Sequence, residues 1–208
     1  MENTVNRIIL RGTLAEPPAF SHENHGRRFY RFALEVPRLS GTADILPVLA
    51  AEPALAALEA IEADYIEVTG QIRSFNSRLE NGRKLLVSVY ASGLRLCGGE
   101  PANQVELSGA VCKPPVFRRT PLGREICDVM LAVNRQYRRS DYIPCIFWGR
   151  TAQTVARLTV GERLSLTGRL QSRTYNKVLD TGVERRTAYE VSAITASAEA
   201  YSNSNAPV

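Results

Sequence analysis

The chain has few of the residues that build metal and redox centres. Its 208 residues include two histidines and four cysteines, and the cysteines stand at positions 97, 112, 127 and 145 with no Cys-x-x-Cys pair. This spacing argues against a zinc ribbon and against a redox motif. Isolated cysteines of an intracellular protein are expected to be reduced and to behave as small hydrophobic side chains. We therefore predict no metal and no other cofactor.

Long apolar runs, targeting signals and catalytic motifs are also missing. No uncharged apolar run approaches the roughly 20 residues that cross a bilayer, and the opening MENTVNR has an acid where a signal peptide has positive charge. There is no glycine-rich phosphate loop and no Gly-x-Ser-x-Gly elbow. Asp128 and Asp141 could form a nuclease pair, but arginines nearby give both an ordinary ion-pair role. We expect a cytoplasmic, nucleoid-associated protein without membrane contact that is not an enzyme.

An internal repeat with a period of about 97 residues organises the chain. A shift of 97 positions places Gly12 on Gly109 and Pro47 on Pro144, and conserved spacing of such turn residues indicates two copies of one unit. Hydrophobic residues make up 44% of the chain, which is enough for each copy to bury a core. The predicted segments are a first domain at 4–97, a linker at 98–102, a second domain at 103–199 and a short disordered tail at 200–208.

Both copies combine strands with one helical segment. Val105 and Leu107 alternate with polar neighbours, as in a half-buried strand. Helical spacing is confined to the region of Ala152 and Val155 and to its counterpart behind Pro53. Each copy then has five strands with a short helix after the third strand. This order predicts an all-β protein of two tandem OB-fold barrels, a shape that commonly binds oligonucleotides.

Strand parity predicts an aromatic outer face on the second copy. Along 142–148, the inward positions are Ile143, Cys145 and Phe147, and the outward positions are Tyr142, Ile146 and Trp148. The strand that follows has inward leucines, so its outward positions are Arg169, Gln171, Arg173 and Tyr175. Exposed rings interleaved with cations favour single-stranded nucleic acid, because bases stack on the rings and cations contact phosphates. The alternative is that the rings cover a second core or a subunit interface.

The positive charge is concentrated in the same copy. Residues 103–199 hold 15 basic and 9 acidic side chains, whereas residues 5–96 hold 11 and 10. A basic face next to aromatic rings is typical of a nucleic-acid-binding protein. The predicted DNA-binding residues are Arg118, Arg119, Arg124, Arg135, Tyr137, Arg138, Arg139, Tyr142, Trp148, Arg150, Arg169, Gln171, Arg173, Tyr175 and Lys177.

The first copy lacks the corresponding rings. Ile45 stands in place of Tyr142, Ala51 in place of Trp148, and the segment 39–42 in place of the arginine-rich loop. Phe75 is a candidate counterpart of Tyr175. We therefore expect this barrel to serve architecture, pairing or partner contact, with at most a weak contribution to strand binding from Arg27, Arg28, Arg31 and Phe75.

The second copy resembles the bacterial single-stranded DNA-binding protein family. The resemblance rests on 103–109 (NQVELSG), on 131–135 with Tyr137 and Arg138, on 141–150 (DYIPCIFWGR) and on 168–175 (GRLQSRTY). It covers about 95 residues, and the first copy only in outline. In this family the rings matching Tyr137, Tyr142, Trp148 and Tyr175 stack on bases, so the resemblance implies that role here.

The resemblance also implies an assembly and a set of partners. Family members usually act with four barrels, so two barrels per chain suggest a homodimer. They usually end in an acidic tip with a phenylalanine that recruits replication and repair enzymes, whereas 200–208 contains neither an acid nor a phenylalanine. We expect sequence-independent binding and protection of single-stranded DNA in replication, recombination or repair. The alternatives are a replication-restart or recombination accessory protein acting mainly through protein contacts, and a pure interaction scaffold.

Overall fold

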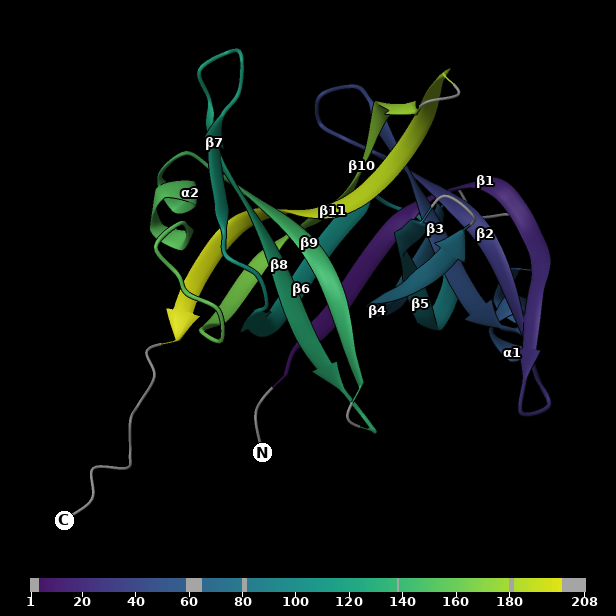
Figure 1. The fold of residues 1–208 in the computed structure, drawn as a ribbon. Coiled ribbons are helices and arrows are strands. Elements are labelled where there is room, and N and C mark those ends of the chain that lie inside the picture. Colours follow the sequence, from purple (N-terminus) through teal and green to yellow (C-terminus); the bar gives the residue numbers. More distant parts are fainter. Residues whose placement is uncertain (1–3, 59–64, 80–81, 138, 180–181, 200–208) are drawn as a thin grey trace.

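The computed structural model describes residues 4–58, 65–79, 82–137, 139–179 and 182–199. The elements of the first copy are β1 (Asn6–Asn24), β2 (Arg27–Pro37), β3 (Ala43–Ala51), α1 (Glu52–Leu55), the 3-10 turn η1 (Ala56–Leu58), β4 (Tyr65–Leu79) and β5 (Gly82–Cys97). Those of the second copy are β6 (Ala102–Val111), β7 (Val116–Arg119), β8 (Glu125–Arg135), β9 (Arg139–Trp148), α2 (Gly149–Val155), β10 (Arg163–Leu179) and β11 (Gly182–Glu199). The predicted order of strands and helix is confirmed in the first copy, whereas the second copy has one additional short strand, β7, between the first and second predicted strands; Figure 1 shows the copies as two adjacent barrels.

Each copy closes into a five-stranded barrel. In the N-terminal barrel β1 pairs with β4 and with β2, and the circuit is completed through β5 and β3. In the C-terminal barrel β6 pairs with β10 and β8, and the circuit runs through β11 and β9. Closure leaves no open sheet edge within the circuit. The predicted all-β fold of two tandem OB-fold barrels is confirmed.

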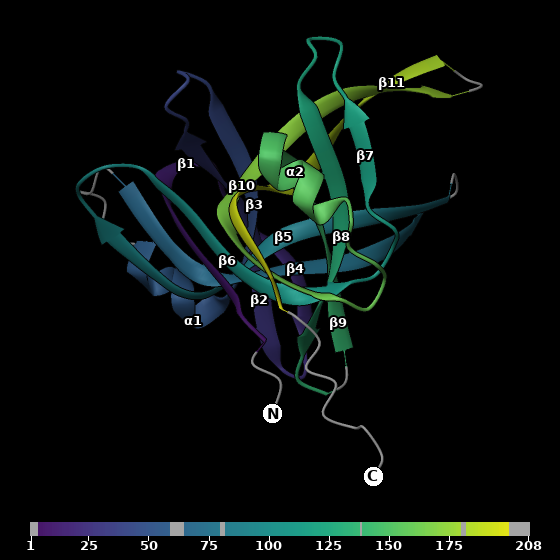
Figure 2. The ribbon, with the colours of Figure 1, turned by 90° about the vertical axis from the view of Figure 1, so that its left-hand side faces the viewer.

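The alternation read from the sequence places the core. Val129, Leu131, Ile143 and Phe147 are buried inside the C-terminal barrel at 3% exposure or less. The helix α2 packs against β8, β9 and β11 (Figure 2) and buries Val155. Ile146 differs from the prediction, because it has outward parity and yet is buried. Its neighbours across the sheet, Asp128 on β8 and Ser192 on β11, help to cover it.

Repeated glycines allow the first strand of each barrel to bend from one partner to the next. The pairing of β1 passes from β4 to β2 near Gly12. A Cβ at Gly12 would lie 2.1 Å from the Glu35 carbonyl oxygen, and a Cβ at Gly109 would lie 2.7 Å from the Ala132 carbonyl oxygen. Such distances are too short for any side chain. Closure of the barrels therefore requires glycine at positions 12 and 109.

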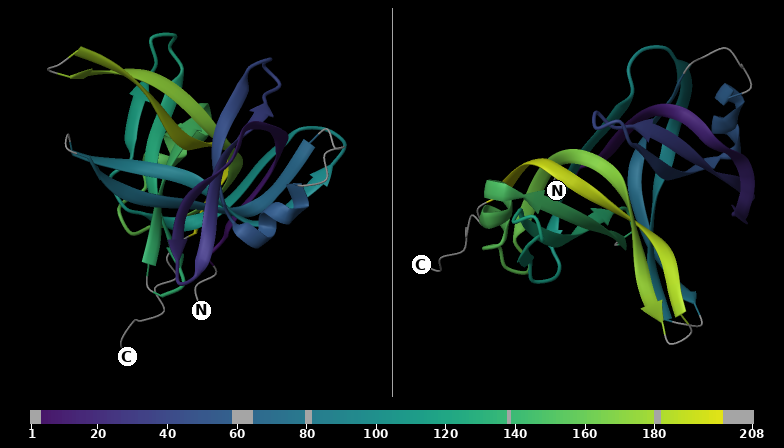
Figure 3. Two further views of the ribbon diagram at one scale, coloured as in Figure 1. Left: turned by 90° about the vertical axis from the view of Figure 1, so that its right-hand side faces the viewer. Right: turned by 90° about the horizontal axis from the view of Figure 1, so that it is seen from above.

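The two barrels share one continuous sheet. Strands β1 and β6 pair antiparallel, with Ile8 opposite Val105, which is the same residue position in the two copies. A pseudo-twofold axis therefore passes through this pair. The long hairpins β4–β5 and β10–β11 extend beyond their own barrels on the same side of the molecule (Figure 3), and β11 contacts β5. Among the described residues no helix is long and apolar enough to span a membrane.

Candidate nucleic-acid interface

Three aromatic side chains lie on the outer face of β9 and β10, as parity predicted. Tyr142 is 43% exposed, Trp148 38% and Tyr175 36%. The indole Nε1–H of Trp148 donates a hydrogen bond to the Ser192 hydroxyl at 3.1 Å, which orients the ring on the barrel surface. The Arg173 guanidinium lies 5.4 Å from the centre of the Tyr175 ring, a cation–π geometry. We call this set of four residues, Tyr142, Trp148, Arg173 and Tyr175, the ring face.

The ring face is a path and not a pocket. Tyr142 and Trp148 are six residues apart on one strand, which corresponds to about 20 Å at the rise of a β-strand. Tyr175 lies further along β10, opposite Arg186 of β11. Rings spaced in this way suit an extended polymer whose successive units stack at separate positions.

Some predicted cations of this barrel are free and others are held by carboxylates. Arg118 bonds to Asp128 at 2.6 Å and Arg119 to Glu125 at 2.8 Å. The hydrogen bond that Arg118 donates to Asp128 is also the main reason why the pKa of Arg118 is raised. Among the described residues, the predicted cations that form no ion pair are Arg124, Arg139, Arg150, Arg169 and Lys177.

A carboxylate occupies the middle of the ring face. Glu190 is 7% exposed and accepts a hydrogen bond at 2.9 Å from the Gln171 amide, while Arg173 lies 3.6 Å from the same Oε1 atom. Gln171 has the predicted outward parity, but this contact keeps it 8% exposed. The sequence suggested Gln171 as a free DNA contact, whereas the structure shows it supporting Glu190.

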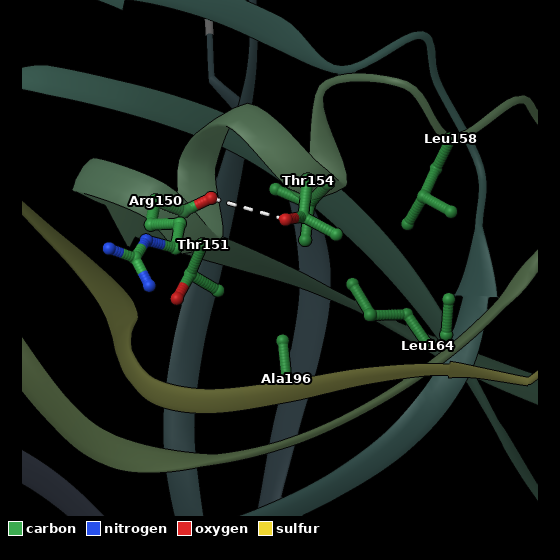
Figure 4. A pocket seen from close by; sticks show the side chains of 8 residues that line it. Arg150, Thr151, Thr154, Leu158, Leu164 and Ala196 are labelled. Carbon is green, nitrogen blue, oxygen red and sulfur yellow. Dashed lines mark hydrogen bonds between the residues drawn. The ribbon is translucent and has the colours of Figure 1, made fainter.

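The structure separates two predicted arginines from the ring face. Arg135 reaches inward to the buried Asp141, with 3.6 Å between Nη1 and Oδ1. Arg150 is the second residue of α2 and lines a small pocket of about 160 Å³ with Leu158, Leu164 and Ala196 (Figure 4). The remaining predicted positions are Tyr137, which is 89% exposed in the β8–β9 turn, and Arg138, which lies outside the described residues.

The outer face of the N-terminal barrel carries rings that the sequence did not reveal. Phe29, His22 and Tyr90 come from three different strands and contact one another in a row. A comparison of equivalent positions missed them, because it tested only whether Ile45 and Ala51 matched the rings of the second copy. The sequence did contain a signal for them. Phe29 and Arg31 are an odd number of residues away from the inward-pointing Phe32 on the same strand, so their side chains point outward.

The structure also changes the counterpart of Phe75. The Asp44 carboxylate contacts Ser172, and the Asp141 carboxylate contacts Ser74, so Ser74 and Ser172 are equivalent. Phe75 therefore occupies the position of Arg173 and not that of Tyr175. It is 58% exposed.

Nothing in the described part of the chain resembles a metal centre. No group of three or more His, Cys, Asp or Glu side chains is close enough there to hold an ion. The four cysteines are free thiols. Burial raises the pKa of the Cys145 thiol, and Glu190 nearby raises it further. Cys145 is therefore a neutral core side chain.

Comparison with known proteins places the C-terminal barrel in a family. The model of the single-strand binding protein family matches residues 102–198. The single-stranded DNA-binding protein A of Bacillus subtilis is 40% identical over 80 residues, covering 35% of this chain and 46% of that protein. The single-stranded DNA-binding protein B of the same species is 36% identical over 80 residues, covering 71% of that shorter protein. The alignment thus spans about half the length of the first relative and more than two thirds of the second.

A solved structure matches both barrels together. The wild-type single-stranded DNA binding protein from Thermus aquaticus superposes with a TM-score of 0.75, covering 98% of this chain and 97% of that one. The sequence identity is 22%, so this likeness concerns the fold. The tandem arrangement therefore has a precedent over nearly the whole chain.

Proposed function

The chain belongs to the single-strand binding protein family, and from this premise we propose that it binds single-stranded DNA without sequence preference. As a member of this family it is a binding protein and not an enzyme. The observation that supports the proposal is the ring face, where three exposed rings lie along one barrel surface and the Arg173 guanidinium lies beside the Tyr175 ring. Stacking accepts every base, and the cations contact the phosphates that every strand carries.

The geometry favours a single strand over duplex DNA. In a duplex the bases are stacked on one another, so their faces are closed to Trp148 and Tyr175. On an extended strand the bases can stack on rings separated by about 20 Å along β9. We propose that the protein protects such strands during replication, recombination or repair in the bacterial cytoplasm, and that residues 4–97 and 103–199 act as two modules of a homodimer with four barrels.

An accessory role through protein contacts is the second candidate. Phe117 and Leu122 on the β7–β8 hairpin are 42% and 84% exposed, and apolar side chains at a hairpin tip can dock a partner. This role leaves the three rings of the ring face without a purpose. We therefore place it second.

Trp148 is the single tryptophan of the chain and reports directly on the proposal. Titration with oligo(dT) of increasing length should quench its fluorescence. Leaving out Arg150, which lines the pocket beside α2, four predicted cations form no ion pair among the described residues: Arg124, Arg139, Arg169 and Lys177. They predict a log–log salt slope of about −3, because each neutralised phosphate of a single strand contributes about −0.7. A parallel titration with oligo(U) measures the preference for DNA over RNA. The absence of both quenching and binding at low salt would overturn the proposed function.

A further inference from the structure

We propose that Ser74 of the N-terminal barrel is a positioning residue for the ring face, because its hydroxyl holds the backbone of Tyr142 in place. This inference rests on the proposed function, since it needs the Tyr142 ring to stack on a base. The family match covers residues 102–198 and therefore assigns no role to Ser74. On this proposal, part of the affinity of the C-terminal barrel for a strand depends on a side chain of the other barrel.

Tyr142 lies where β9 leaves its own barrel. On one side β9 pairs with β8, and Tyr142 is opposite Ala132. On the other side β9 pairs with β11 at Cys145 and Ile146, which lie further along the strand. At Tyr142 this second side of β9 meets β4 of the N-terminal barrel instead. The backbone that carries the Tyr142 ring is therefore held by one strand of each barrel.

Ser74 supplies the hydrogen-bond acceptor at this point of β4. The Tyr142 N–H donates to the Ser74 Oγ atom, with 2.6 Å between nitrogen and oxygen. Ser74 is 8% exposed, so little water can reach the hydroxyl, and loss of a shielded acceptor leaves the N–H unpaired. In a strand the side chain stands roughly perpendicular to the sheet. Fixing the backbone at Tyr142 therefore sets the direction in which its ring leaves the barrel surface.

Two further hydrogen bonds hold Ser74 against β9. The Ser74 backbone N–H donates to Oδ1 of Asp141 at 2.8 Å, and Arg73 Nη1 donates to Oδ2 of the same carboxylate at 3.1 Å. Asp141 is fully buried and directly precedes Tyr142. Two neighbouring residues of β4 thus bond three times to two neighbouring residues of β9. The Ser74 hydroxyl is therefore held firmly enough to fix another group.

The equivalent contact between β10 and β3 differs in what the serine hydroxyl bonds to. Ser172 is the counterpart of Ser74, and its hydroxyl donates to the Asp44 carboxylate at 3.0 Å. Asp44 is followed by Ile45, which stands in place of Tyr142 in the first copy. The bond from a serine hydroxyl to the strand backbone is thus observed where that strand carries an aromatic ring. Attachment of the hairpins alone would be served equally well by either arrangement.

The test is a double-mutant cycle on the full chain, followed through the quenching of Trp148 fluorescence by oligo(dT). Ser74→Ala removes the hydroxyl acceptor and keeps the backbone N–H that bonds to Asp141. Tyr142→Ala removes the ring that the hydroxyl positions. The double variant combines both changes, and the cycle measures whether their effects on affinity are independent.

Ser108→Ala is the matched control for the loss of a buried hydroxyl. Ser108 is 2% exposed on β6, and its Oγ atom accepts a hydrogen bond from Arg163 at 3.3 Å. Thermal unfolding of every variant measures how much each hydroxyl contributes to stability. A comparison of Ser74→Ala with Ser108→Ala then separates an effect on binding from an effect on stability.

The expected losses of affinity follow from the proposed geometry. Tyr142→Ala should weaken binding at least about fivefold, because one stacked base contributes that much or more. Ser74→Ala should weaken it about threefold or more, the effect of one hydrogen bond, but less than Tyr142→Ala, because the ring is still present. In the Tyr142→Ala background, Ser74→Ala should change the affinity by less than about twofold. Ser108→Ala should bind like the wild type.

The salt dependence provides a second readout. Ser74→Ala changes no charge, so its log–log salt slope should equal that of the wild type if only the placement of a ring is lost. A changed slope would show that the substitution had moved phosphate-binding cations, and it would overturn the proposal.

The outcomes separate this inference from the proposed function. An equal loss from Ser74→Ala with and without the Tyr142 ring would overturn the inference, because Ser74 would act through another group. Wild-type affinity in Ser74→Ala, or an equal loss in Ser108→Ala, would overturn it as well. In all these cases the wild type still binds oligo(dT), so the proposed function stands. Failure of the wild type to bind any oligonucleotide would overturn both.

Discussion

The Asp44 carboxylate accepts a hydrogen bond at 2.7 Å from the backbone N–H of Ser172, which lies 128 residues further along the chain. The equivalent contact in the opposite direction joins Asp141 to the backbone N–H of Ser74 at 2.8 Å. Each carboxylate is fully buried and is also paired with arginine, Asp44 with Arg38 and Asp141 with Arg73. The hairpin β10–β11 is thereby fixed against β3, and the hairpin β4–β5 is fixed against β9.

Loss of one of these carboxylates should destabilise the fold. Asp44→Ala leaves the Arg38 charge and the Ser172 N–H without their buried partner, and breaking such a pair costs about 3–5 kcal/mol when both partners are buried. Because Arg38 is 23% exposed, we expect about 2–4 kcal/mol in the free energy of unfolding by denaturant. The control is Asp128→Ala, whose pair with Arg118 is half-exposed and should cost less than about 1 kcal/mol. Equal costs would contradict the structural role of Asp44.

The ring of Trp148 should matter more than its hydrogen bond. Trp148→Ala should weaken binding of a labelled oligo(dT) by about 1–3 kcal/mol, the range for one stacked base. Trp148→Phe keeps a stacking surface and loses the bond to Ser192, so it should retain most of the affinity. Val160→Ala alters an exposed turn before β10 and serves as the control. If Trp148→Phe and Trp148→Ala bound oligo(dT) equally weakly, base stacking would not explain the contribution of Trp148 to binding.

Neutralising the carboxylate within the ring face should strengthen binding. Glu190→Gln keeps the size of the side chain, frees Arg173 from its 3.6 Å contact and removes a charge that repels phosphate. We expect tighter binding at low salt and a log–log salt slope steeper by up to about 0.7, since one more cation becomes available. Glu106→Gln makes the same charge change on β6, where the residue is exposed on the strand that joins the barrels. A gain of equal size in that control would show a general charge effect.

Stability should fall in acid through Glu67. Its carboxylate bonds to Arg11 at 2.7 Å and to Arg95 at 2.6 Å, and the hydrogen bond from Arg11 is the main cause that lowers its pKa. A lowered pKa in the folded state means that this stabilisation is complete above the ordinary glutamate value, near 4.3. It is lost as the pH falls through the lowered value. Glu67→Gln should therefore differ from the wild type in thermal midpoint at neutral pH, and the difference should shrink in acid. A constant difference would contradict this assignment.

The sequence by itself determined the repeat, the strands and the inner and outer faces of the second barrel. Ile143, Cys145 and Phe147 are buried and Tyr142 and Trp148 exposed, as parity predicted. The reason is local, because successive side chains of a strand alternate between its two faces. A comparison at fixed spacing therefore located the barrels and the rings of the second one.

Only the tertiary structure decided which side chains meet across strands. Gln171 is on the predicted face but is covered by Glu190, nineteen residues away, and Arg135 turns inward to Asp141. The rings of the first barrel belong to β1, β2 and β5, and their contact depends on strand pairing that a position-by-position comparison does not contain. Parity along one strand says which face a residue joins, whereas pairing between strands decides its neighbours on that face. For this reason the contacts of Phe29 with His22 and Tyr90 became visible only in the folded chain.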